Sequence, residues 1–106
     1  MPAYAVAILS ETRLNDEIRA YLAQIDATLA PFGGQYIIHG GPVVRMEGEP
    51  VGDLIVVQFP DLELASRWYQ SAAYQAIRPL RTENSCGTVF IIQGVPAGHR
   101  ATDILA

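Results

Sequence analysis

Lysine is absent from this 106-residue chain, and all seven of its basic residues are arginine. Catalysis through a lysine Schiff base and phosphate binding by a P-loop lysine are therefore excluded. The formal net charge is −4 and no basic stripe occurs. Nucleic-acid binding depends on clustered positive charge, so the sequence predicts no nucleic-acid partner.

Cysteine is almost absent too, since Cys86 is the only one. One cysteine cannot form an intrachain disulfide, which excludes a disulfide-stapled secreted domain. The start "MPAYAVAILSE" lacks the basic region of a signal peptide, and no run of about eighteen apolar residues could span a membrane. We therefore expect a cytoplasmic protein.

Neither a metal nor a cofactor is predicted. The two histidines lie far apart in the chain and show no metal-ligand spacing. "GGPVVRMEG" lacks the strand–turn–helix context of a dinucleotide-binding glycine motif.

The apolar content is high enough for a packed core: half of the residues are apolar and only 17% are charged. The length suits one domain, predicted over residues 1–94, followed by a C-terminal tail over 95–106. The apolar segment Ala3 to Ser10 predicts a strand. An amphipathic helix follows, capped by Asn15 or Asp16 and ended by Pro31 and Gly33–Gly34. Its predicted buried stripe contains Leu14, Ile18, Tyr21, Leu22, Ile25 and Leu29.

The second half of the domain repeats this order. Residues Gln35 to Gly48 are extended but interrupted by Gly40-Gly41-Pro42, which indicates an edge strand or a bulge. Leu54 to Phe59 is an apolar strand, and Asp61 can cap a second helix. That helix is predicted to end at Ser71, where another short turn starts and runs through Tyr74 to Leu80. Gly87 to Gly94 forms the last strand. The inner face of the second helix is expected to contain Leu62, Ala65, Trp68 and Tyr69.

This order predicts an α+β, ferredoxin-like βαββαβ fold, with an antiparallel four-stranded sheet and both helices on one face. The strands are apolar on both faces, however, and two helices can cover only one. An apolar sheet face rarely stays in water, so we predict a homodimer packed sheet to sheet. The alternative is a monomer whose tail folds over the open face.

The chain also resembles a known family. The matching segments are "YAVAIL", "PFGGQYIIHGG" and "IVVQFPDLELASRWYQSAAYQAIRPLR", which look like the small bacterial proteins of domain-of-unknown-function family 1330. The resemblance implies the dimeric α/β-barrel superfamily, which also contains antibiotic-biosynthesis monooxygenases and muconolactone isomerases. Many relatives have Arg at the position of His39 and Pro at that of Ala72. The first departure changes the proton chemistry of a candidate site.

His39 is the candidate catalytic residue, because an imidazole before a glycine pair can move a proton near neutral pH. The alternative is a histidine hydrogen-bonded to backbone beside a bulge. Arg81, expected near the start of the last strand, can hold a carboxylate through two parallel hydrogen bonds, unless it pairs with Glu83 or another acid of the chain. Tyr74 and Tyr69 are the other candidate substrate-binding residues.

The alternatives to a binding role remain open for several of these residues. Trp68 and Tyr69 fit helix-to-sheet packing as well. A nucleophilic Cys86 paired with His39 is not favoured. Three functions remain: a cofactor-free enzyme acting on a small organic acid or aromatic, a non-catalytic small-ligand-binding module, and a structural dimer.

Overall fold

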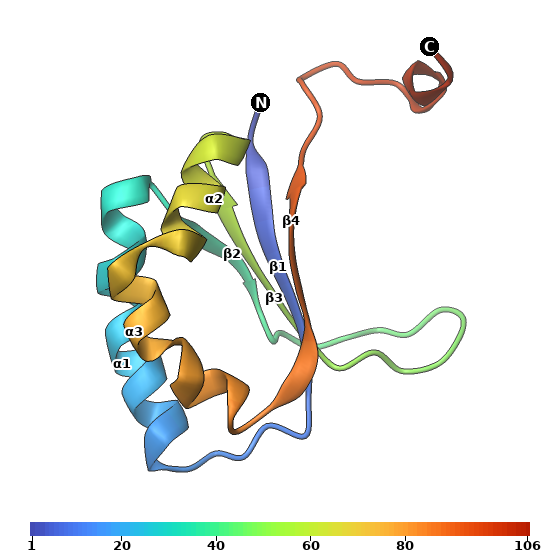
Figure 1. Ribbon diagram of the computed structural model, residues 1–106. Helices are drawn as coiled ribbons and strands as arrows, with labels where there is room; N and C mark the ends of the chain where they lie inside the picture. The colour runs from blue at the N-terminus through green and yellow to red at the C-terminus, as the bar shows by residue number, and fades with distance from the viewer.

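The computed structural model describes residues 1–106, and its elements follow the predicted order. They are β1 (Ala3–Ser10), α1 (Asp16–Leu29), β2 (Gln35–His39), β3 (Asp53–Phe59), α2 (Leu62–Gln70), α3 (Ala72–Thr82) and β4 (Cys86–Gln93). The strands form one antiparallel sheet in the order β2-β3-β1-β4. The helices all lie on one side of it (Figure 1). This is the predicted α+β, ferredoxin-like arrangement.

The helix boundaries are set by the predicted capping residues. The Asn15 side chain accepts a hydrogen bond from the Ile18 amide at 3.0 Å, which satisfies an amide at the start of α1. Asp61 does the same for α2, accepting from the Leu64 amide at 2.8 Å. Gly33 follows the 3₁₀ turn after α1 with a φ of 73°, a left-handed conformation that glycine adopts without strain.

The segment after Ser71 differs from its prediction. It forms an eleven-residue helix, not a short turn, and Pro79 lies inside it. Proline lacks the N–H for one helix hydrogen bond, and its ring crowds the carbonyl one turn earlier. The helix nevertheless continues past it, since the Pro79 carbonyl accepts from the Glu83 amide at 3.0 Å. Arg81 consequently sits in the last turn of α3 and not beside the last strand, so its side chain is directed by a helix.

Three leucines predicted to be buried are exposed. Leu14 is 71% exposed because it precedes the N-cap, and Leu62 is 41% exposed at the first residue of α2. Leu22 is 42% exposed because the buried stripe of α1 runs through Ile18, Tyr21 and Ile25. The core forms between that stripe, α2, α3 and one sheet face.

Strand register decides which side chains enter this core. Ala5 of β1 lies opposite Val57 of β3, and both are buried under the helices. The alternate residues point to the other side, which we call the open face. It carries Tyr4, Val6, Ile8, Ile38, Leu54, Val56, Gln58, Cys86, Thr88, Phe90 and Ile92. None of these residues is charged, and no helix covers them.

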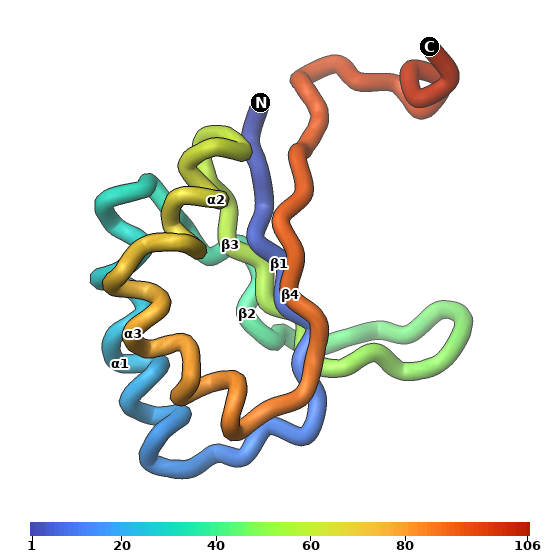
Figure 2. Tube along the Cα trace, viewed as in Figure 1, coloured from blue at the N-terminus to red at the C-terminus, as the bar shows by residue number.

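Two segments extend from the sheet on the side of the open face. Residues 40–52, which we call the arm, contain no regular structure, so the predicted strand Gln35 to Gly48 ends at His39. The arm and the C-terminal tail both point away from the helices (Figures 1 and 2). The tail therefore does not fold over the open face. None of the helices is both long and apolar enough to cross a membrane.

Candidate functional site

A cavity of about 300 Å³ lies between the helices and the sheet. Most of its lining is apolar, from β1, β3 and α1. Among its exposed lining residues are Thr12, His39 and Asp53, where β1 ends and the arm begins. Ligand sites in proteins are typically concave, mostly apolar and about 300–1,000 Å³ in volume. The cavity is therefore large enough for a small molecule.

Two tyrosines and an arginine form the buried polar part of the wall. Tyr21 of α1 and Tyr74 of α3 share a hydrogen bond of 2.8 Å between their hydroxyls. Their rings meet edge to face, 6.2 Å apart. Burial raises the pKa of the Tyr21 phenol, and the neighbouring Tyr74 raises it further. The Tyr21 hydroxyl therefore stays neutral near pH 7 and remains able to donate and accept hydrogen bonds.

Arg81 is only 8% exposed and lines the same cavity. The structure has two ion pairs, Arg19–Asp16 and His99–Asp103, so Arg81 has no acidic partner and the alternative pairing with Glu83 does not form. Burial acts to lower the pKa of Arg81, but the Tyr74 and Tyr21 hydroxyls beside it raise the pKa overall. Arg81 is thus a mostly buried residue whose positive charge has no carboxylate partner in the chain.

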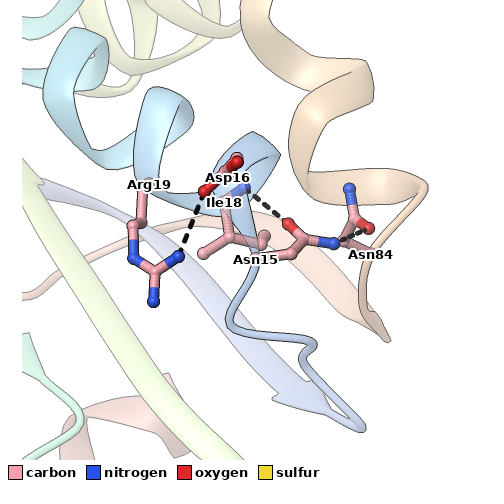
Figure 3. A network of polar contacts seen from close by, with 5 residues as sticks. All are labelled: Asn15, Asp16, Ile18, Arg19 and Asn84. Carbon is pink, nitrogen blue, oxygen red and sulfur yellow. Dashed lines mark hydrogen bonds and ion pairs between the residues drawn. The ribbon is translucent and has the colours of Figure 1, made fainter.

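A hydrogen-bonded cluster holds the backbone next to Arg81. Asn15 donates to the side-chain oxygen of Asn84 at 2.6 Å (Figure 3). The Asn84 side chain in turn donates to the Leu80 carbonyl at 2.8 Å. The backbone N–H of Asn84 and the side-chain hydroxyl of Ser85 both donate to the backbone carbonyl of Arg81. These bonds tie the start of α1 to the end of α3, so we call them the latch. The latch fixes the helix turn that carries the guanidinium.

His39 reaches the cavity because of a bulge in β2. Tyr36 pairs with Val57 and His39 pairs with Ile55, although the two β2 residues are three apart. The irregularity between Tyr36 and Ile38 brings both rings to the helix side of the sheet. They stack with centroids 4.6 Å apart. Burial raises the pKa of Tyr36 to about 12, and Asp26 adds to this effect.

The structure brings together three of the four predicted site residues. His39, Tyr74 and Arg81 all line the cavity. Tyr69 lies behind it, with its ring 5.3 Å from that of Tyr74 and 6.0 Å from that of Trp68. Trp68 is buried as expected and also borders the cavity.

Cys86 lies apart from this cavity, exposed at the start of β4. A hydrogen bond to Glu11 raises the pKa of its thiol, which disfavours a nucleophilic thiolate.

Tyr21 and Tyr36 line the site but were not predicted as site residues. Tyr21 falls within the apolar stripe of α1, where an aromatic residue is typical of core packing. Tyr36 was part of the expected strand, and alternation without a bulge would have placed Tyr36 and His39 on opposite faces. The sequence feature that could have indicated these two residues is the presence of five tyrosines in a chain of 106 residues.

The arrangement suits recognition of an anion attached to an apolar body. A guanidinium binds a carboxylate through two parallel, charge-assisted hydrogen bonds. The hydroxyls of Tyr21 and Tyr74 beside Arg81 can complete the contacts to such a group. At the other end, the exposed imidazole of His39 can exchange protons with solvent. No group of three or more His, Cys, Asp or Glu side chains suited to a metal ion is present.

Comparison with known proteins gives a family and a fold. Residues 2–95 match the family model described as domain of unknown function, DUF1330. No curated protein matches the chain significantly. A structure of unknown function from Rhodopseudomonas palustris is similar at 10% identity, with a TM-score of 0.64 over 90% of this chain and 83% of that one.

Two further structures share the fold. A dimeric ferredoxin-like protein of unknown function from Jannaschia is 14% identical, with a TM-score of 0.61 over 91% of this chain and all of the other. SnoaB, a cofactor-independent oxygenase from Streptomyces nogalater, is 10% identical, with a TM-score of 0.54 over 93% of this chain and 96% of the other. At these identities the likeness concerns the fold alone.

Proposed function

The chain belongs to the DUF1330 family, and we propose that it binds a small organic acid with an apolar or aromatic body in the cavity between helices and sheet. Arg81 is the anion-binding residue, and Tyr74 and Tyr21 contribute hydroxyls beside it. The apolar walls hold the body of the ligand. His39 lies among the exposed lining residues, where the ligand would meet solvent.

One observation carries this proposal: Arg81 is a buried charge without an acidic partner, and it borders a cavity. Burying an uncompensated charge is costly, and proteins normally pair such a group or hydrate it. An arginine that only stabilised the fold would be expected to hold a carboxylate of its own chain. An anion entering the cavity supplies the missing charge, which favours carboxylates over neutral molecules of the same shape.

A matched pair of ligands tests the class. Aromatic and aliphatic carboxylates should raise the melting temperature in a thermal-shift screen, whereas the corresponding carboxamides should not. The two members of each pair share size and apolar surface, so a difference between them reports the charge. Equal stabilisation by acids and amides would show that the cavity accepts ligands for their apolar body alone. No stabilisation by any small molecule would favour a structural dimer.

A cofactor-free enzymatic activity is the second candidate, and the position of His39 favours it. The imidazole could take a proton from an acidic C–H or O–H of a bound molecule and return it to solvent or to another atom of that molecule. SnoaB shares the fold and is a cofactor-independent oxygenase, which shows that the fold can carry chemistry without a cofactor. If His39 acts this way, wild-type protein in D₂O exchanges a carbon-bound hydrogen of a bound acid for deuterium, and His39→Gln does not.

A homodimer through the open face is part of the same proposal. The face is apolar and uncharged, so an identical face complements it without any charge pairing, as a two-fold interface requires. Phe90 and Ile92 are 41% and 52% exposed in the single chain. The Jannaschia structure with this fold is dimeric. The single exposed Cys86 fits the cytosol, a reducing compartment.

A further inference from the structure

We propose that the arm, residues 40–52, is a clasp that packs on the second copy of the chain in the homodimer. This inference rests on the homodimer proposed above and adds the element that completes its interface. Four apolar side chains of the arm are largely exposed in the single chain, at 70%, 82%, 83% and 66% for Val43, Val44, Met46 and Val51. No other part of the same chain covers them.

The area of the open face shows why such an element is needed. Four strands of 8, 5, 7 and 8 residues, spaced about 4.8 Å apart and rising about 3.3 Å per residue, present roughly 450 Å². A stable interface buries about 800 Å² on each partner. The sheet face alone therefore falls short by roughly 350 Å². At about 60–120 Å² for each fully buried apolar side chain, the four residues of the arm supply the missing area.

The direction of the arm points to the same occupant. Figures 1 and 2 show it extending beyond the sheet on the side opposite the helices, where a second copy on the open face would lie. The radius of gyration is 15.1 Å, against about 13 Å for a compact chain of this length, because the arm and the C-terminal tail both extend from the domain. Gly40, at a φ of 65°, turns the chain out of β2 into the arm. The arm thus extends to the side where the partner would lie.

The charges of the arm argue against a membrane as the occupant. The arm carries Arg45 but also Glu47 and Glu49, and an anionic lipid surface attracts clustered positive charge instead. A second copy of the chain presents an uncharged open face, so the charged side chains of the arm would lie at the edge of the interface. Apolar residues of the arm can then pack on the partner while its carboxylates stay in water.

The test compares two variants of the arm in the full-length protein. Val44→Asp/Met46→Asp adds charge where the clasp requires burial, and Glu47→Gln/Glu49→Gln alters only the exposed carboxylates. Sedimentation equilibrium should show the dimer dissociation constant rising at least about tenfold in the first variant and changing less than about twofold in the second. Circular dichroism checks that both keep the fold.

Each outcome has a separate meaning. If the parent protein is monomeric at every concentration, the homodimer itself fails. If the parent is a dimer and Val44→Asp/Met46→Asp dissociates no more readily, the clasp is wrong while the homodimer stands. A photo-reactive amino acid at position 44 provides a second readout that does not weaken the interface. Illumination of this variant should give a covalent product of the size of a dimer. The same group at position 24, where Gln24 lies on the outer side of α1, should give no such product. If the variant at position 44 gives no dimer-sized product, the clasp is wrong.

Discussion

The hydroxyls of Tyr21 and Tyr74 lie 2.8 Å apart, although the two residues are 53 positions apart in the chain. Their hydrogen bond joins the first helix to the third inside the cavity wall, beside a guanidinium that has no acidic partner. Buried polar side chains of this kind are costly unless each is satisfied. The pair therefore contributes both to the packing of α1 on α3 and to the polar end of the proposed ligand site.

The tyrosine pair should behave as a coupled unit. Tyr21→Phe and Tyr74→Phe each leave one buried hydroxyl without its partner, so each should lower the free energy of unfolding by about 1–3 kcal/mol. The double variant removes both hydroxyls and should cost less than the sum of the two single changes. Urea unfolding of the four proteins measures the coupling. Strict additivity would show that the hydroxyls act independently.

Alkaline pH should destabilise the protein through Tyr36. Its pKa is raised to about 12 in the folded chain, mainly by burial, whereas an unfolded tyrosine has a pKa of about 10. The unfolded chain thus loses the proton first as the pH rises. The contribution is complete below pH 10 and is lost between about pH 10 and 12, at about 1.4 kcal/mol per pH unit.

Tyr36→Phe isolates this contribution. The variant should match the parent near pH 8 and lose stability less steeply above pH 10, as measured by chemical unfolding at a series of pH values. Parallel curves for the two proteins over the whole range would contradict the assignment to Tyr36.

The latch at the end of α3 should contribute to the free energy of unfolding through several hydrogen bonds. Asn84 is 5% exposed and bonds to Asn15, Glu17 and Leu80 through its side chain. Asn84→Ala should lower the free energy of unfolding by about 2–3 kcal/mol, because the partly buried groups that bond to the Asn84 side chain lose their hydrogen-bond partner. Asn15→Ser keeps a helix cap but shortens the side chain that reaches Asn84, so it should cost about 1 kcal/mol. A loss of less than 0.5 kcal/mol in both, an order-of-magnitude limit for surface changes, would show that the latch is unimportant.

The open face should be sensitive to a single charge. Phe90→Asp places a carboxylate on β4 within the proposed interface and should convert the proposed dimer to a monomer, because an unpaired buried charge costs several kcal/mol. Gln24→Glu, on the outer side of α1, is the matched control and should leave the dimer intact. Size-exclusion chromatography with light scattering separates the two results. A dimeric Phe90→Asp protein would place the interface elsewhere.

Local signals in the sequence were enough to predict most of the elements. Capping residues such as Asn15 and Asp61 mark helix starts through their own backbone bonds, and the apolar pattern of β1 is read within eight residues. The ferredoxin-like order follows from these elements. The prediction for α3 was wrong, because Ser71 was taken only as the end of the second helix, whereas its side chain also caps a new helix by accepting from the Tyr74 amide.

The site depended on contacts that the sequence does not contain. His39 enters the cavity only because of a bulge of one residue, and Arg81 does so because it belongs to a helix turn. Tyr21 has the spacing of a core residue, and nothing near it indicates that its hydroxyl meets Tyr74. Long-range contacts of this kind are determined by tertiary packing, so residue types suggested candidates while the geometry selected among them.

Isothermal titration calorimetry with an aromatic carboxylate, on wild-type protein and on Arg81→Met, tests the central claim most directly. Arg78→Met is the control, since Arg78 bonds to Gln75 on the same helix and does not line the cavity. We expect the acid to bind the wild type and Arg78→Met, and to bind Arg81→Met at least about tenfold more weakly, equivalent to about 1.4 kcal/mol. Arg81→Met should be no less stable than the parent, because it removes an uncompensated buried charge. Equal affinity in all three proteins would show that Arg81 does not bind the acid, and the proposed site would be wrong.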